Sequence, residues 1–290
     1  MNKNTYVKWI LFALLALIWG SSFILMKEGL KGLSPYQVAS LRILSAGITL
    51  VPFLRKAIKG VPKNMLGPIV LSGFLGTFFP AFLFCIAETK IDSSLAGVLN
   101  SLTPICTIAI GTAFFKLKIG WMKWLGLFLG FAGIVILMIG GIHQMNLSYL
   151  GYTLCILVAT FCYGLNVNVV NQYLKEFSAL NIATIAFTAL IIPTSIILIT
   201  TGFFSQINMH NQIWITASLA SIMLGVAGTC LASVIFYTLV KKAGPVFTSM
   251  VTYGIPFVAI FWGVIAGEAV TAIQVAGMVV ILVGVRMINK

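Results

Sequence analysis

Long apolar runs separated by short polar segments dominate this chain of 290 residues. Each run is close to the ~20 residues that a helix needs to cross a bilayer. Because the runs are continuously apolar and do not alternate, they predict helices and not the strands of a membrane barrel. The pattern therefore predicts an all-α integral membrane protein with ten transmembrane helices. The predicted spans are residues 7–26, 36–55, 65–87, 93–115, 121–141, 149–173, 179–201, 213–240, 244–266 and 271–288.

Composition excludes a soluble protein. Charged residues make up 8% of the chain and hydrophobic residues 60%, whereas soluble domains carry roughly 25% charged residues. The net charge of +13 does not predict a nucleic-acid partner, because the basic residues lie in short segments between the apolar runs. All five cysteines fall inside apolar runs and form no C-x-x-C pair, so neither a disulfide framework nor a metal site is expected. The first run is too long for a signal peptide and reads as an uncleaved span.

The distribution of lysine and arginine predicts the orientation in the membrane. If the N-terminus lies inside, 14 of the 18 basic residues face the cytoplasm and three, Lys27, Lys31 and Lys90, face outside. Such an excess is typical of cytoplasmic loops. The remaining basic residue, Arg42, lies within a predicted span. We therefore expect a multi-pass protein of the bacterial cytoplasmic (inner) membrane with both termini in the cytoplasm.

An internal repeat divides the sequence into two halves. The segment Gly73–Thr77 matches Gly225–Thr229 at an offset of 152 residues, and other matches share this offset or one close to it. The boundaries of the expected repeats are 1–144 and 145–290. Five spans in each repeat is an odd number, so the halves would enter the membrane from opposite sides. The sequence thus predicts a 5+5 inverted repeat, an architecture that gives carriers two related conformations.

Two apolar segments in corresponding places of the halves contain a polar residue followed by a proline. Asn100 and Pro104 in the first half match Thr252 and Pro256 in the second. A spacing of four residues places each pair on one face of a helix. Proline inside an apolar helix frees a carbonyl group, which must find a partner in protein or in cavity water. These two segments therefore predict a solute path between the halves at mid-membrane.

Several motifs carry a family resemblance that covers essentially the whole chain. The sequence resembles the drug/metabolite transporter superfamily, and within it the EamA-type ten-helix members. The motifs are Ile18-Trp19-Gly20-Ser21-Ser22-Phe23, Arg42, Asn100-x-x-x-Pro104, and Gly267-Glu268 followed by Gly277 and Gly284. The resemblance implies a carrier whose central cavity is lined by spans 1, 3, 4, 6, 8 and 9, in a family whose members export amino acids and other small metabolites. One departure is Leu117, at a position where the family often has glutamate.

Polar and aromatic side chains on the presumed inner faces are the candidates for the solute path. Each would either contact the solute or tie neighbouring helices together, since an amide or hydroxyl in lipid needs a hydrogen-bond partner. The candidates are Trp19, Ser22, Thr77, Phe84, Asn100, Pro104, Tyr163, Asn166, Thr229, Tyr237, Thr252, Tyr253 and Pro256.

Two charged residues are candidates for contacts with charged groups or protons. Arg42 is an intramembrane cation, which is costly without partners. It would contact a solute carboxylate, or it would serve the structure through helix-end carbonyls, Asp92 or snorkelling. Glu88, near the outer end of the third span, would accept a proton or an amine, or pair with Lys90. The residue that corresponds to Arg42 in the second half is Ala186.

The sequence contains no enzyme motif, no nucleotide-binding loop and no metal-ligand cluster, so neither catalysis nor a cofactor is expected. We expect a secondary transporter, an exporter of small organic metabolites such as amino acids, that works by alternating access. The alternative is a non-transporting membrane receptor or scaffold subunit, which would need no open cavity. The expected partners are a small-molecule solute and the lipid bilayer, with the chain acting as a monomer or homodimer.

Overall fold

The computed structural model describes residues 3–91, 93–139, 150–265 and 271–288. Every regular element in these ranges is helical, and they contain no strand. Six of the helical segments are long and apolar enough to cross a membrane, and three shorter apolar helices accompany them. The prediction of an all-helical membrane protein is therefore confirmed.

The helices follow the predicted spans closely, although several spans consist of more than one element. The α-helices are α1 (Lys3–Leu30), α2 (Pro35–Leu50), α3 (Leu54–Lys59), α4 (Leu66–Gly73), α5 (Phe79–Ala87), α6 (Ser93–Asn100), α7 (Thr103–Phe114), α8 (Trp121–Ile139), α9 (Leu150–Val169), α10 (Ala179–Thr200), α11 (Gln212–Met223), α12 (Ala232–Ser249), α13 (Ile255–Ile265) and α14 (Ala272–Ile288). Shorter elements continue or join them: the π-helices η3 (Phe74–Phe78), η5 (Val170–Leu174) and η7 (Leu224–Leu231), and the 3-10 helices η1 (Val51–Phe53), η2 (Lys63–Met65), η6 (Phe204–Gln206) and η8 (Met250–Tyr253).

Local sequence signals set several helix ends. Ser34 caps α2 in a capping box with Gln37, and Pro35 occupies the first turn, where its missing N–H has no cost. The side chain of Gln37 also donates a hydrogen bond to the carbonyl of Thr201, which ties the start of α2 to the end of α10. Inside α12, Gly244 adopts a φ of 79° and breaks the helical path, so the long apolar stretch there turns between two spans.

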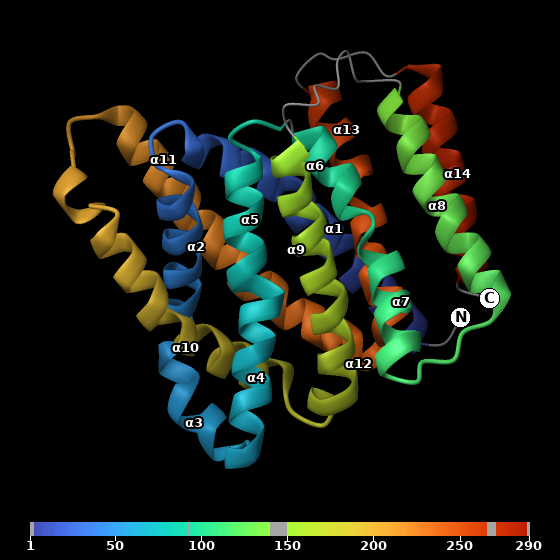
Figure 1. Cartoon of the computed structure of the whole chain (residues 1–290), viewed down its shortest axis with the longest axis horizontal. Coiled ribbons are helices and arrows are strands. Elements are labelled where there is room, and N and C mark those ends of the chain that lie inside the picture. Colours follow the sequence, from blue (N-terminus) through green and yellow to red (C-terminus); the bar gives the residue numbers. More distant parts are fainter. Residues whose placement is uncertain (1–2, 92, 140–149, 266–270, 289–290) are drawn as a thin grey trace.

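The first helix of each half packs mainly against the other half. Helix α1 contacts α11, α12 and α13, whereas α9 contacts α5, α6 and α7. Figure 1 shows α9 between α5 and α7. The two bodies that face each other are therefore mixed. One contains α4 to α7 with α9, and the other contains α11 to α13 with α1 and α2.

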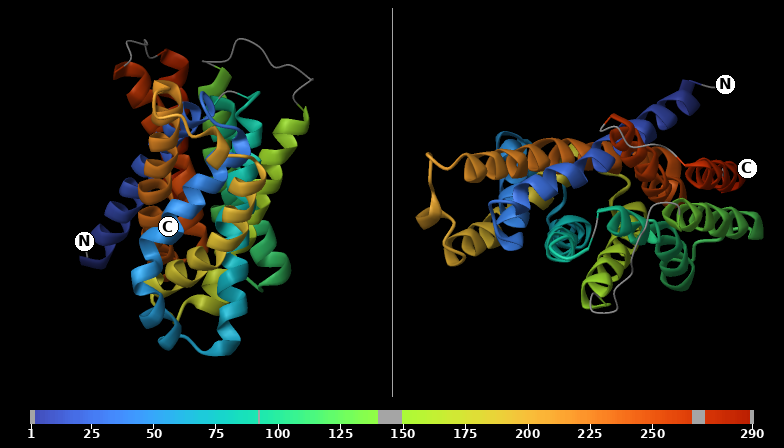
Figure 2. Two further views of the ribbon diagram at one scale, coloured as in Figure 1. Left: turned by 90° about the vertical axis from the view of Figure 1, so that its left-hand side faces the viewer. Right: turned by 90° about the horizontal axis from the view of Figure 1, so that it is seen from above.

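Corresponding helices from the two halves meet at both ends of the molecule. Helix α2 packs along α10, and α8 packs along α14; seen from above, the α8–α14 pair lies at the end opposite the α10–α11 connection (Figure 2). The α8–α14 contact depends on glycine. A Cβ atom at Gly126 would lie 2.7 Å from the carbonyl oxygen of Gly284, and one at Gly133 would lie 2.8 Å from that of Gly277. The backbones thus approach closely, as small residues allow in membrane helix pairs.

Connections between helices alternate between the two ends of the bundle. In Figure 1 the α1–α2, α5–α6 and α10–α11 connections lie at the top, whereas the α3–α4, α7–α8 and α9–α10 connections lie at the bottom. Large apolar side chains such as Ile10, Phe161 and Ile192 remain exposed on the outer surface. A surface of this kind suits a lipid environment.

Candidate functional site

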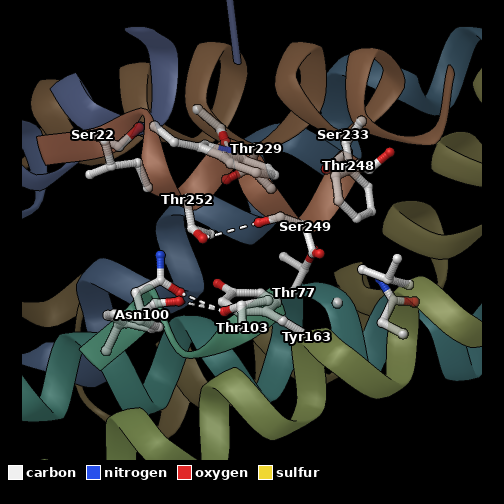
Figure 3. A pocket seen from close by; sticks show the side chains of 18 of the residues that line it. Ser22, Thr77, Asn100, Thr103, Tyr163, Thr229, Ser233, Thr248, Ser249 and Thr252 are labelled. Carbon is white, nitrogen blue, oxygen red and sulfur yellow. Dashed lines mark hydrogen bonds between the residues drawn. The ribbon is translucent and has the colours of Figure 1, made fainter. Parts of the chain in front are cut away.

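A cavity of about 100 Å³ lies between the two mixed bodies. Its lining combines hydroxyls, two amides, aromatic rings and one charged side chain. The lining residues are Trp19, Ser22, Phe23, Met26, Arg42, Gly76, Thr77, Phe84, Asn100, Thr103, Tyr163, Asn166, Val167, Gly228, Thr229, Ser233, Phe236, Tyr237, Thr248, Ser249, Thr252 and Ile255. We call the residues from α5 to α7, η3 and α9 the first wall, and those from α1, α2, η7, η8, α12 and α13 the second wall. Figure 3 shows Asn100, Thr103, Thr77 and Tyr163 facing the labelled residues of the second wall.

Each wall contains a π-helix at the position of the repeated glycine motif. Element η3 contains Gly76 and Thr77, and η7 contains Gly228 and Thr229; all four residues line the cavity. A π-helix widens the helical turn and shifts hydrogen bonds, a feature that occurs frequently at functional sites. The repeat therefore places the same local distortion on both sides of the cavity.

The glycines of the π-helices allow close approach of a helix from the other half. A Cβ atom at Gly228 would lie 2.7 Å from the hydroxyl oxygen of Ser22, and one at Gly76 would lie 2.8 Å from the side-chain amide carbon of Asn166. Ser22 and Asn166 occupy corresponding positions, 144 residues apart. The same glycine-mediated contact thus occurs twice, once for α1 on η7 and once for α9 on η3.

Arg42, which α2 contributes to the second wall, is bonded to the neighbouring element η7 of that wall. Its Nε donates a hydrogen bond of 2.7 Å to the hydroxyl of Thr229. That hydroxyl in turn donates to the carbonyl oxygen of Leu224, at 3.3 Å and five residues earlier in the π-helix. Trp19 makes a related contact, since its indole Nε1 donates to the carbonyl oxygen of Gly228 at 3.2 Å. Two groups of η7 therefore position side chains of the lining: the hydroxyl of Thr229 holds Arg42, and the carbonyl of Gly228 holds Trp19.

Asn100 and Thr252 lie at corresponding breaks in the fourth and ninth predicted spans. The hydroxyl of Thr103 contacts both the backbone carbonyl and the side-chain oxygen of Asn100, at 2.6 and 3.2 Å. The hydroxyl of Thr252 donates to the carbonyl of Ser249 at 3.0 Å, and Figure 3 shows both contacts as dashed lines on opposite sides of the cavity. At each break, a threonine hydroxyl thus donates a hydrogen bond to a backbone carbonyl group.

Aromatic rings also occur in matched pairs. Trp19 packs against Phe236 with ring centroids 5.6 Å apart, and Tyr163 packs against Phe84 with centroids 6.1 Å apart. Trp19 corresponds to Tyr163, and Phe84 to Phe236, in the internal repeat. Phe23 lies at 6.3 Å from Phe84. The apolar part of the lining therefore has one aromatic pair on each wall, and each pair joins one ring from each sequence half.

A buried polar chain crosses the space between the two bodies beside the cavity. Ser72 is fully buried and donates a hydrogen bond of 2.6 Å to Oδ1 of Asn166. Its hydroxyl also lies 3.4 Å from that of Tyr237 on α12. The amide of Asn166 and the phenol of Tyr237 both line the cavity. These contacts join the two walls at one end of the cavity.

Ten of the thirteen residues predicted for the solute path line the cavity: Trp19, Ser22, Thr77, Phe84, Asn100, Tyr163, Asn166, Thr229, Tyr237 and Thr252. The other three lie outside the lining. Tyr253 is fully buried, and its hydroxyl donates to the carbonyl of Leu127 at 2.9 Å. Pro104 and Pro256 lie in the first turns of α7 and α13, so the helices break before the prolines and not at them.

Of the two charged candidates, Arg42 lines the cavity and Glu88 does not. Glu88 is buried at the end of α5, 7% exposed. The sequence-based prediction also missed several polar lining residues, among them Thr103, Ser233 and Ser249. Spacing could have found them, because Ser233 follows Thr229 by four residues and Ser249 precedes Thr252 by three.

The lining offers little to a metal ion. Within the described residues no group of three or more histidine, cysteine, aspartate or glutamate side chains is placed to hold one. The five cysteines are all reduced, and none of them lies in the lining.

Apolar spanning helices around a polar internal cavity define a multi-pass membrane protein, and comparison with known proteins identifies its class as transporter. The chain belongs to the EamA-like transporter family, which matches it twice, at residues 7–139 and 150–290. It is thereby a member of the drug/metabolite transporter superfamily, and it groups with transporters and not with enzymes.

Three relatives extend over nearly the whole chain. "Uncharacterized transporter YdfC" of Bacillus subtilis is 27% identical and covers 98% of this chain and 92% of its own length. "Uncharacterized inner membrane transporter YedA" of Escherichia coli is 24% identical, over 96% and 89%. "Probable amino-acid metabolite efflux pump" of Salmonella typhimurium is 25% identical, over 93% and 91%. A protein of known crystal structure shares the fold, with 17% identity, a TM-score of 0.74, and coverage of 98% of this chain and 96% of that one.

Proposed function

We propose that the protein is a secondary transporter that exports small organic metabolites, such as amino acids, across the bacterial cytoplasmic (inner) membrane by alternating access. The observation that carries this proposal is the central cavity, which corresponding elements of two sequence repeats build from opposite sides. A cavity with two equivalent walls can open toward either side through equivalent movements. The name of the Salmonella relative, a probable amino-acid metabolite efflux pump, supports the choice of solute and direction.

The proposed architecture is ten transmembrane helices in a 5+5 inverted repeat, with repeats at 1–144 and 145–290. Two observations support it. The contact of Ser22 with Gly228 repeats as the contact of Asn166 with Gly76, as expected of elements related by a pseudo-two-fold axis. The connections also alternate between the ends of the bundle in the order that five spans per repeat require.

The proposed orientation places both termini in the cytoplasm. The connection between α3 and α4 carries Lys59 and Lys63, and the connection between α7 and α8 carries Lys116 and Lys118. Both lie at the bottom of the view in Figure 1. The excess of positive charge at one end is the pattern expected of a cytoplasmic face.

The packing of α1 and α9, each against helices of the other sequence half, suggests which parts of the protein move during transport. Since α1 packs on α11 to α13 and α9 packs on α5 to α7, the two sequence halves are interlocked and cannot separate as rigid bodies. We propose that the moving units are the two mixed bodies, each containing helices from both repeats. The cavity lies between them, so that a change in their angle would open it toward one side or the other.

Labelling of introduced cysteines tests alternating access. In a background without the five native cysteines, Asn100→Cys and Thr252→Cys place a thiol on each wall of the cavity. We expect a membrane-impermeant maleimide to modify both from either side of the membrane, with the favoured side changing when solute is added to one compartment. Thr194→Cys is the control, because Thr194 is fully buried and lies outside the lining.

Labelling from one side alone, under every solute condition, would contradict alternating access and favour a receptor or scaffold. Modification of the control thiol at Thr194 to the same extent would indicate unfolding and not transport-related exposure.

A further inference from the structure

The two walls of the cavity are built from corresponding elements, but one charged side chain has no charged counterpart at the matching position of the other repeat. Within the described part of the chain, Arg42 is the sole charged residue of the lining, and its counterpart in the other repeat is Ala186. Both positions pack against a glycine of the repeated motif, Gly225 in η7 and Gly73 directly before η3: a Cβ atom at Gly225 would lie 3.0 Å from the carbonyl carbon of Arg42, and one at Gly73 would lie 3.1 Å from Cβ of Ala186. Because alanine supports the same packing, the fold does not require a guanidinium group at this position.

The guanidinium group retains most of its capacity to bind. Within the part of the chain that the structure describes, its one hydrogen bond, from Nε to Thr229, uses one of the five N–H donors. No ion pair joins Arg42 to a carboxylate among the residues that the structure describes. A cation in a water-poor site attracts an anion far more strongly than one in bulk water does. The two terminal nitrogens are the groups that bind a carboxylate in a bidentate manner.

The remaining lining suits an apolar body with one negative charge. The pairs Trp19–Phe236 and Tyr163–Phe84 supply aromatic surface. No aspartate or glutamate of the described residues belongs to the lining, so none of them supplies a counter-charge for an ammonium group there; Asp92 and Glu268 lie outside the described residues. A volume of about 100 Å³ is several times the ~10–15 Å³ that one water molecule needs, so the cavity admits a small organic solute.

We propose that the cavity binds a monocarboxylate with an aromatic or branched apolar body, and that Arg42 determines its selectivity for negative charge. This inference rests on the proposed function and narrows its solute class. Compounds with the same body should bind in the order carboxylate, zwitterion, amine. Hydroxyl groups such as that of Thr252 would hydrate the polar end of the solute without adding charge.

Three ligands with one phenylalkyl body test the proposal: 3-phenylpropanoate, L-phenylalanine and 2-phenylethylamine. Calorimetric titration of the full chain in lipid nanodiscs measures their affinities. Arg42→Gln should weaken binding of 3-phenylpropanoate by about tenfold or more, because a charge-assisted hydrogen bond is lost. It should leave the amine unchanged or bound more tightly. Arg42→Lys retains the charge and should keep the order of the three ligands, with weaker binding of the carboxylate.

Two matched substitutions separate the role of Arg42 from the general effect of a lost hydroxyl. Thr229→Val removes the hydrogen bond that positions Arg42, and Thr194→Val removes a hydroxyl that is fully buried outside the lining. We expect Thr229→Val to reduce the ratio of carboxylate to amine affinity, and Thr194→Val to leave that ratio at the wild-type value. Size-exclusion profiles and unfolding temperatures establish that each variant is folded.

The proposal is overturned if the amine binds as tightly as the carboxylate, if Arg42→Gln weakens all three ligands equally, or if none of the three binds. Flux into proteoliposomes distinguishes this failure from that of the proposed function. Charge-ordered binding without flux would reject transport and leave the role of Arg42 intact. Flux of L-phenylalanine that Arg42→Gln does not alter would reject the role of Arg42 and leave transport intact.

Discussion

At the scale of single residues, glycine decides how closely the helices around the cavity can approach. Gly225 lies against the backbone of Arg42, and Gly228 lies against Ser22. Any side chain at these positions would have to displace backbone atoms or a hydroxyl of the lining. These residues thus act on the site through distance, although Gly225 itself does not line the cavity.

We predict that Gly225→Ala destabilises the protein and that Gly67→Ala does not. A methyl group at Gly225 would overlap the carbonyl of Arg42, and such overpacking costs about 1–3 kcal/mol. Gly67 has no heavy atom within 4 Å of the position of a Cβ atom, so alanine there only gains helix propensity. Thermal unfolding in detergent, followed by the fluorescence of a thiol-reactive dye, provides the measurement. Equal unfolding temperatures for the two variants would show that α2 tolerates a shift away from η7.

At the scale of elements, the two π-helices and the two interrupted spans form the walls. In η7, the carbonyl group of Gly228 accepts a hydrogen bond from Trp19 of a neighbouring helix. Each interrupted span begins a new helix with a proline in its first turn and carries a threonine that caps the break. Backbone carbonyl groups at these irregular elements are thus bonded by side chains of the lining.

We predict that Ser72→Ala lowers stability, because it removes the hydrogen bond to Asn166 between α4 and α9. An amide oxygen left without its partner in a buried site costs about 1–3 kcal/mol. Ser40→Ala is the matched control: Ser40 is also fully buried, and its hydroxyl has no hydrogen-bond partner within the described residues. Alanine at position 40 should therefore be neutral or stabilising. Unfolding temperatures of the two variants check the difference, and an equal loss would assign the effect to buried volume alone.

At the scale of the whole molecule, the exchange of α1 and α9 joins the two repeats. The N-terminal helix completes a body that otherwise belongs to the second repeat, and α9 completes the other. The α2–α10 and α8–α14 pairs lie at opposite sides of the bundle, where corresponding helices of the two repeats meet. The protein is therefore one interlocked unit, and neither repeat has a complete cavity of its own.

Fusion of reporters tests the proposed orientation of the whole chain. Green fluorescent protein attached after Lys290 should fluoresce, and alkaline phosphatase at the same position should be inactive, because the C-terminus is expected in the cytoplasm. Alkaline phosphatase inserted after Gln206, in the α10–α11 connection, should be active. The opposite pattern at both positions would reverse the membrane orientation, and activity of phosphatase at both would contradict the three spans predicted between Gln206 and the C-terminus.

The sequence predicted the elements well because a bilayer leaves little choice of structure. An apolar run of spanning length must satisfy its own hydrogen bonds, and a helix does so locally. The same periodicity placed Asn100 and Thr252 on inner faces, and both line the cavity. The periodicity wrongly predicted that Tyr253 lines the cavity. Tyr253 ends the 3-10 helix η8, and its side chain points to Leu127 and not to the cavity. The periodicity also placed Glu88 on the same face as Thr77 and Phe84, but α5 ends there, beyond the cavity.

By itself, then, the sequence determined what local physics controls: the helices, their places along the chain and the internal repeat. The tertiary structure decided what depends on contacts between distant segments. At a glycine of η3 and of η7 a helix from the other repeat approaches closely, and the exchange of α1 and α9 determines which segments face the cavity. Neither contact follows from local sequence alone, because each joins segments that lie far apart in the chain, as Gly76 meets Asn166 and Gly228 meets Ser22.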